Sequence, residues 1–104
     1  HRMFLTLTNA RIKNIKEAAR HKAYFQFLGV QLGLAADTAE AVEVFSAMYR
    51  NFVAEPQPAP HIMCYIQRSA DEKGKPMALV NDRAYQLFDD ELFISYAHMI
   101  MFGP

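Results

Sequence analysis

The run DTAEAVEVFSAMYRNFV, residues 37–53, is the most regular segment of the chain. Its apolar side chains follow the i, i+4, i+7, i+8, i+11 spacing of one helix face, at Ala41, Phe45, Met48, Tyr49 and Phe52. Asp37, with Glu40 three residues later, has the spacing of a capping box. We therefore predict a core-facing helix over residues 38–53, and the segments around it must supply the surface that this helix covers.

The segment before this helix, residues 24–34 (YFQFLGVQLGL), is typical of a strand. Large apolar residues occur at both parities, which suits a long strand buried for part of its length on both faces. Gly29 and Gly33 lie inside it, where glycine suggests a bulge or a close approach of another part of the backbone.

The N-terminal segment predicts a short strand and a helix. Residues 3–9 (MFLTLTN) have strand composition, and residues 10–23 place a thin apolar stripe on one helical face, with Asn9 as the expected N-cap. The opposite face is basic, with Arg11, Lys13, Lys16, Arg20 and Lys22. Such a face could contact an acidic partner or a phosphate, but a solvated face is the simpler interpretation, because the stripe contains alanines where a membrane-binding helix carries large apolar residues.

After the central helix the chain becomes extended. Three alternating prolines within residues 55–60 predict a stiff connector. Residues 61–69 (HIMCYIQRS) alternate, with Ile62, Cys64 and Ile66 on one face of a predicted strand.

The remaining segments predict an antiparallel meander and a final helix. Residues 71–75 form a charged turn, and two short strands follow, one around Met77 and Leu79 and one around Tyr85 and Leu87. The last helix begins at Asp89 or Asp90 and is apolar on nearly all sides, so its outer face is an expected interaction surface, formed by Leu92, Phe93, Tyr96 and Ile100.

Together these segments give the order β-α-β-α-β-β-β-α. We predict an α+β fold, in which one mainly antiparallel sheet carries helices on one side. Residues 3–104 are of single-domain length, and residues 1–2 are expected to be a vector remnant before Met3. Because the chain stops directly after an apolar helical run, we also expect it to be a fragment of a longer protein.

Composition narrows the classes of function. The 11 basic and 11 acidic residues cancel, which argues against a nucleic-acid-binding module, since phosphate neutralisation needs a basic excess.

No apolar run approaches the roughly 20 residues that span a bilayer, and no signal peptide opens the chain. With one cysteine, Cys64, no intrachain disulfide is possible. We therefore expect a cytoplasmic protein without a membrane partner, and a net charge near zero favours self-association.

No catalytic constellation is evident in the sequence. Phosphate-binding glycine loops and nucleophile elbows are absent from it. His61 and Cys64 point to opposite faces of a strand, so a structural role is the better interpretation than a metal site. Asp89, Asp90 and Glu91 could bind a divalent cation, but acidic residues also stabilise a helix N-terminus, and we favour that role. We predict no catalytic residue, metal or cofactor in this chain.

The segment from Gly29 to Phe102 resembles the N-terminal region of HPr-serine-kinase-related proteins. The resemblance rests on residues 27–30 (FLGV), the helix with Phe45 and Tyr49, the strand at His61, the strands over residues 77–88 and the closing apolar helix. It implies that a P-loop kinase-like core follows such a helix, and that nucleotide-binding residues lie beyond Pro104.

Two functions remain open at this point. In the first, the chain is a non-catalytic accessory or protein-interaction domain that binds a protein partner or forms a homodimer. In the second, it is a small-ligand-binding sensor whose ligand contacts Tyr24, Tyr65 and Tyr85. A closed apolar pocket with convergent polar groups would favour the second. We favour the first.

Overall fold

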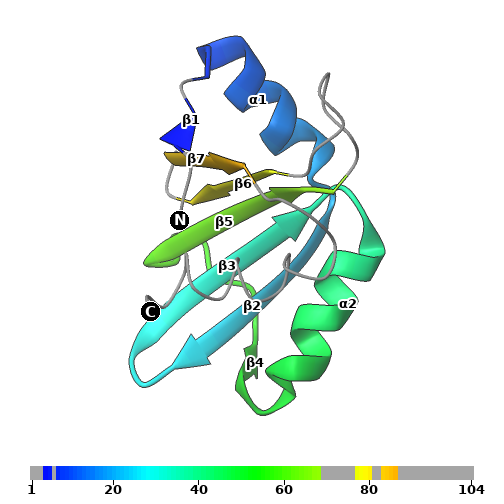
Figure 1. Ribbon diagram of the computed structural model, residues 1–104. Coiled ribbons are helices and arrows are strands. Elements are labelled where there is room, and N and C mark those ends of the chain that lie inside the picture. The colour runs from blue at the N-terminus through cyan, green and yellow to red at the C-terminus, as the bar shows by residue number, and fades with distance from the viewer. Residues whose placement is uncertain (1–3, 6, 69–76, 81–82, 87–104) are drawn as a thin grey trace.

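The computed structural model describes residues 4–5, 7–68, 77–80 and 83–86 (Figure 1). This part of the chain forms a sheet of seven strands with two α-helices and one short 3-10 helix. Their bounds are β1 Phe4–Leu5, α1 Asn9–Ala18, β2 His21–Phe27, β3 Val30–Ala36, α2 Ala39–Met48, η1 Arg50–Phe52, β4 Val53–Ala54, β5 Ile62–Gln67, β6 Met77–Val80 and β7 Arg83–Gln86. The predicted α+β class is confirmed, and the predicted order of elements is close to the observed one. The predicted turn over residues 71–75 and the predicted final helix lie outside the described residues.

The strand order across the sheet is β1-β7-β6-β5-β3-β2-β4. Five of the six neighbouring pairs are antiparallel, and β3 with β5 is the parallel pair. Parallel neighbours need a crossover connection, and here it runs through α2, η1 and β4 before the chain returns to the middle of the sheet. The sheet is therefore mainly antiparallel, as predicted.

The segment predicted as one long strand over residues 24–34 is a hairpin. β2 and β3 pair along their whole length, from His21 opposite Ala36 to Phe27 opposite Val30. The turn consists of Leu28 and Gly29, both with positive φ, 43° and 85°. The prediction was wrong because the alternation of apolar residues continues through the turn, with no polar residue to mark it.

Helix α1 is shorter than the predicted 10–23. Its N-cap is Thr8 rather than Asn9, and the Thr8 hydroxyl accepts a hydrogen bond from the Arg11 backbone N–H at 3.1 Å. The helix ends at Ala18 because the residues from His21 onward pair with β3. Backbone pairing in the sheet thus overrides the helical periodicity of the last residues.

Helix α2 confirms the core of the 38–53 prediction but ends at Met48, and β4 follows η1. Asp37 is not its cap. Thr38 holds that position without a side-chain cap bond, while the Asp37 carboxylate accepts a 2.8 Å hydrogen bond from the Arg68 backbone N–H. Glu40, expected to complete a capping box, lies 3.5 Å from the Arg68 guanidinium. Both acids therefore join the start of α2 to the end of β5.

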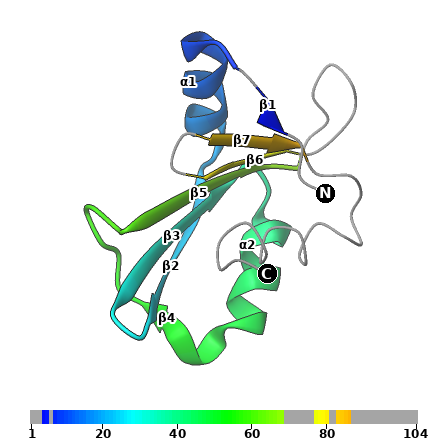
Figure 2. The same ribbon diagram turned by 60° about the vertical axis from the view of Figure 1, so that its left-hand side comes forward.

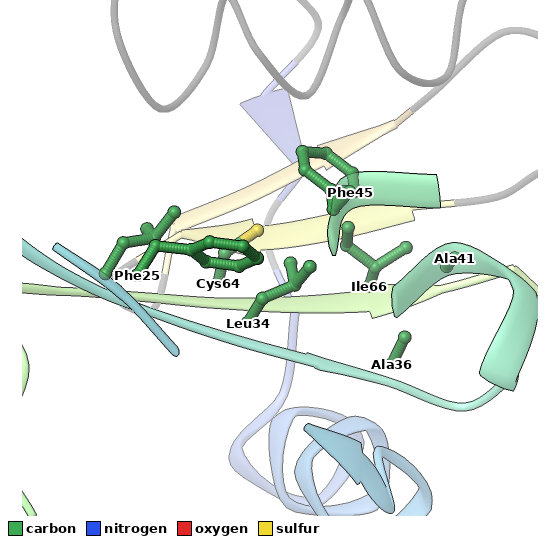
Figure 3. Packing of buried hydrophobic residues seen from close by; sticks show 8 residues of the cluster. Phe25, Leu34, Ala36, Ala41, Phe45, Cys64 and Ile66 are labelled. Atoms are coloured by element: carbon green, nitrogen blue, oxygen red, sulfur yellow. The ribbon is translucent and has the colours of Figure 1, made fainter. Parts of the chain in front are cut away.

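The two described helices pack on opposite faces of the sheet, not on one side as predicted (Figure 2). The reason lies in β5, which carries apolar residues on both faces: Cys64 and Ile66 face α2, and Tyr65 faces α1. Each face of β5 therefore packs against a different helix. Figure 3 shows the larger core, formed by Phe25, Leu32, Leu34, Ala36, Ala41, Phe45, Cys64 and Ile66. The smaller core on the α1 side consists of Ile15, Met77 and Leu79.

The connector over residues 55–60 contacts the β2–β3 hairpin at Gln57 and Pro60. The Gln31 side-chain amide donates a 3.2 Å hydrogen bond to Gln57. A Cβ placed on Gly33 would meet the side chains of Met63, Pro60 and Tyr24. Gly33 is thus crowded by neighbouring side chains, whereas the sequence predicted a bulge or a close approach of backbone there.

Candidate interaction surface

Five large apolar side chains are exposed at the end of the sheet where the β2–β3 turn, η1 and β4 lie near one another (Figures 1 and 2). We call these five residues the tip patch: Leu28, Val30, Met48, Phe52 and Val53. Their exposed fractions run from 38% for Val30 to 103% for Leu28. Single exposed apolar residues are ordinary on a protein surface, but a cluster of them is typical of a binding surface.

The tip patch rests on an aromatic cluster. Phe27 stacks on Phe52 with ring centroids 4.8 Å apart, and its ring meets Tyr49 edge-on at 5.5 Å. Phe25 and Phe45 continue the cluster into the buried core, and the ring of each lies within packing distance of the Tyr49 ring. Phe52, one of the five patch residues, is therefore joined to the core by aromatic contacts.

Leu28 has the most unusual conformation of the patch. Its φ of 43° is in the left-handed region, which costs L-amino acids roughly 1–2 kcal/mol and which two-residue hairpin turns usually fill with Asn, Asp or Gly. Its side chain is fully exposed, so no packing within the described part of the fold offsets this strain. Strain of this kind is most often found at functional sites.

The patch lies at one edge of the sheet. Strand β4 stands at the end of the strand order, and its inner side pairs with β2 through Val53 opposite Phe25. Among the described strands none lies on its outer side. The exposed side chains of Arg50 and Glu55 flank the patch along the chain, and neither forms an ion pair with another described residue.

The sequence indicated other residues as the candidate site. Leu92, Phe93, Tyr96 and Ile100, the predicted interaction face, lie outside the described residues, as do the acidic residues 89–91. Tyr24 and Tyr65 lie on the α1 face of the sheet, in β2 and β5, with β3 between them. Tyr85 lies in β7, opposite Ala78. The ligand contact that we predicted for these three tyrosines stays a prediction.

His61 and Cys64 occupy the structural positions that their spacing indicated. The His61 Nδ1 accepts a 2.9 Å hydrogen bond from the Gln31 backbone N–H at the start of β5. Cys64 is fully buried in the larger core, and burial raises the pKa of its thiol to about 12. Within the described ranges no three His, Cys, Asp or Glu side chains lie close enough to share a metal ion.

The basic face of α1 is partly engaged within the domain. Lys13 and Glu17 form an exposed ion pair at 3.8 Å, and the Lys16 ammonium lies 5.5 Å from the centre of the Tyr65 ring. The Arg11 guanidinium lies 4.0 Å from the Met77 sulfur. These contacts favour the interpretation of this face as a solvated helix surface that also packs on the sheet.

Within the residues that the structure covers, no helix is both long and apolar enough to cross a bilayer. No family model, no curated protein and no solved structure matches this chain significantly.

The tip patch does not follow from the sequence pattern. That pattern places Met48 and Phe52 on the buried face of the helix, and Leu28 and Val30 in a buried strand. One signal was present in the sequence: Gly29 sits in the middle of an otherwise strand-like run, and a glycine there is compatible with a hairpin turn that exposes the residues beside it.

Proposed function

We propose that this chain is a non-catalytic protein-interaction domain that binds its partner through the tip patch. The observation that carries the proposal is the exposure of five large apolar side chains beside an aromatic cluster at one end of the sheet. The strained and fully exposed Leu28 supports it, because an unstrained residue at that turn would serve the fold better. Binding would remove this apolar surface from water and so provide the driving force.

The predicted face of the C-terminal helix, around Leu92 and Phe93, would be a second contact surface of the same module. The two surfaces can be tested separately, because no residue is common to both. The experiment below addresses the tip patch alone.

The proposal can be tested with a photocrosslinking amino acid in the source cells. Benzoylphenylalanine placed at the position of Met48 should form a defined protein adduct on irradiation, because that side chain is exposed within the patch. The matched control places the same amino acid at the position of Lys13, on the solvated face of α1. Adding Leu28→Asn to the first variant should remove the adduct without unfolding the domain. An equal yield of adducts at both positions would contradict the proposal.

We further propose that the domain forms the N-terminal part of a kinase-like protein, as the resemblance over residues 29–102 implies. The supporting observation is the order of sequence features quoted for that resemblance. The test is the intact mass of the untagged gene product from its source cells. A mass far above 11.9 kDa would support this proposal, and a mass near 11.9 kDa would remove it.

A further inference from the structure

We infer that the start of β2 is a separate docking site, which binds an acidic segment of a partner protein in extended conformation. The site goes beyond the tip patch, which lies at the other end of the same strand (Figure 1). Two independent features carry the inference. A short piece of the β2 edge is open, which selects a peptide backbone, and basic side chains surround that piece, which selects acidic side chains.

The open edge is the first feature. On the β4 side of β2, the pairing with β4 covers Tyr24 and Phe25. No described strand lies on that side of residues 21–23, although β3 pairs with them on the other side. A strand edge presents backbone N–H and C=O groups, and an extended peptide can pair with them. A phospholipid or a nucleic acid has no backbone that pairs in this way.

The charge around this edge is the second feature. Residues 11–22 hold five of the 11 basic residues and one of the 11 acidic residues, so they carry a net charge of +4 in a chain whose total is zero. Because α1 ends at Ala18, Arg20 and Lys22 lie beyond the solvated helix face, at the open edge. Both are exposed, and neither forms an ion pair with another described residue. Together with Lys16 of α1 they form what we call the basic corner.

Lys16 and Lys22 lie on the same face of the sheet. Side chains alternate along β2, and Phe25 packs in the larger core on the α2 side, so Lys22 faces the α1 side. The row of paired residues that starts at Lys22 continues through Ala35 to Tyr65. The Lys16 ammonium lies 5.5 Å from the centre of the Tyr65 ring. The basic corner therefore concentrates positive charge on the α1 side of the open edge.

This placement determines the pattern of the partner segment. On an added strand, the residue opposite Lys22 also faces the α1 side, where an acidic side chain would stabilise the pair. The residues on either side of it face the α2 side, where Ala23 packs against the larger core. The segment that fits has acidic residues at alternate positions and apolar residues between them. Basic side chains at an edge also discourage pairing with neutral or basic strands, so they restrict this edge to an acidic partner.

A designed peptide tests the site by nuclear magnetic resonance titration of the isotope-labelled chain. The probe is a short peptide of alternating glutamate and valine with blocked ends. It should shift the backbone amide signals of residues 21–23, and its affinity should fall with added salt. A peptide with lysine in place of glutamate should fail because its charge has the wrong sign. A peptide with proline in place of valine should also fail, because proline lacks the N–H that strand pairing requires.

Charge reversal locates the site on the chain. Arg20→Glu and Lys22→Glu should each weaken binding of the glutamate peptide roughly three- to tenfold, because an attractive pair becomes a repulsive one at an exposed position. Arg50→Glu is the matched control. It changes the net charge by the same amount at the other end of β2, and it should leave peptide binding unaffected.

The outcomes decide between this inference and its alternatives. The inference is wrong if no signal of residues 21–23 shifts up to about 1 mM glutamate peptide, or if the proline peptide binds equally well. It is also wrong if phosphatidylserine vesicles shift these signals and the glutamate peptide does not, because the basic corner would then contact a membrane surface. Leu28→Asn, which alters the tip patch alone, should leave peptide binding unchanged, so the two surfaces can fail independently.

Discussion

Phe27 and Phe52 stack with their ring centroids 4.8 Å apart, although one belongs to β2 and the other to the 3-10 turn that follows α2. This contact holds the end of the helix against the end of the hairpin. Phe27 is half-buried, whereas Phe52 is 42% exposed. The pair is thus the boundary between the core and the tip patch, and the two rings have different expected roles in stability and binding.

Leu28→Asn should stabilise the domain. Asn tolerates positive φ better than leucine does, and the exposed Leu28 side chain has no packing to lose. We expect the free energy of unfolding to rise by about 0.5–1 kcal/mol, measured by chemical denaturation of the monomer. Binding through the tip patch should weaken at the same time. A destabilised Leu28→Asn variant would mean that the Leu28 side chain packs in the free domain.

Phe45→Ala should lower the free energy of unfolding by about 3–5 kcal/mol, because Phe45 is fully buried between α2 and the sheet. Phe52→Ala is the matched control from the same segment. It removes a partly exposed ring and one stacking contact, so its loss should be about 1 kcal/mol. Both values come from chemical denaturation, and a Phe45→Ala loss below about 1 kcal/mol would show that the buried face of α2 is assigned wrongly.

The parts of the fold that the sequence predicts correctly are those with one consistent local period. The alternation of Ile62, Cys64 and Ile66 marks β5, and the stripe through Ala41 and Phe45 marks α2. In both cases the observed burial follows the pattern, because Cys64 and Ile66 of β5 and Ala41 and Phe45 of α2 meet in the larger core.

The errors fall where tertiary pairing competes with local pattern. The last predicted turn of α1 becomes β2 because His21, Lys22 and Ala23 pair with β3. The turn at Leu28 and Gly29 carries an apolar residue in the place of the usual polar one, so the sequence pattern does not mark the hairpin. The same holds for the tip patch: its leucine, two valines, methionine and phenylalanine have the character of core residues, and only the turn and the edge of the sheet leave them exposed.

Gly33→Ala should destabilise the domain, although alanine is normally the better residue in a strand. A Cβ at this position would run into the Met63 sulfur and approach Pro60 and Tyr24 to 3.1 and 3.3 Å. We expect a loss of about 1–3 kcal/mol in the free energy of unfolding. Adding Met63→Ala should make the Gly33→Ala change less costly than it is in the wild-type background, which a double-mutant cycle measures. Purely additive losses would show that the Met63 side chain is not the obstacle.

Asp37→Ala should lower the free energy of unfolding more than Glu40→Ala, although both acids contact Arg68. The Asp37 carboxylate accepts a 2.8 Å bond from a partly buried backbone N–H, so its removal should cost about 1.5–3 kcal/mol. The Glu40 side chain is 71% exposed and lies 3.5 Å from the guanidinium, an arrangement worth less than about 1 kcal/mol. Denaturation at low and at high salt checks the Glu40 assignment, because the effect of losing an exposed ion pair should decrease with added salt.

Cys64 gives a prediction for alkaline pH. Burial raises the pKa of its thiol from the ordinary value of 9.0 to about 12, so the folded chain keeps a proton that the unfolded chain releases. The stability that depends on the neutral thiol is therefore fully present below pH 9.0 and is lost as the pH rises to about 12. Within that window the free energy of unfolding should fall by about 1.4 kcal/mol for each pH unit through this group alone. Lysines and tyrosines also titrate there, so the measurement is the difference in slope between the wild-type chain and Cys64→Ala, and not the slope itself.

At about pH 8 the same burial should protect the thiol from a disulfide reagent until the chain unfolds, because the thiolate is the reactive form. Equal slopes for the two chains, together with rapid labelling of the folded wild type, would place Cys64 at an accessible position and contradict the packing of β5 against α2.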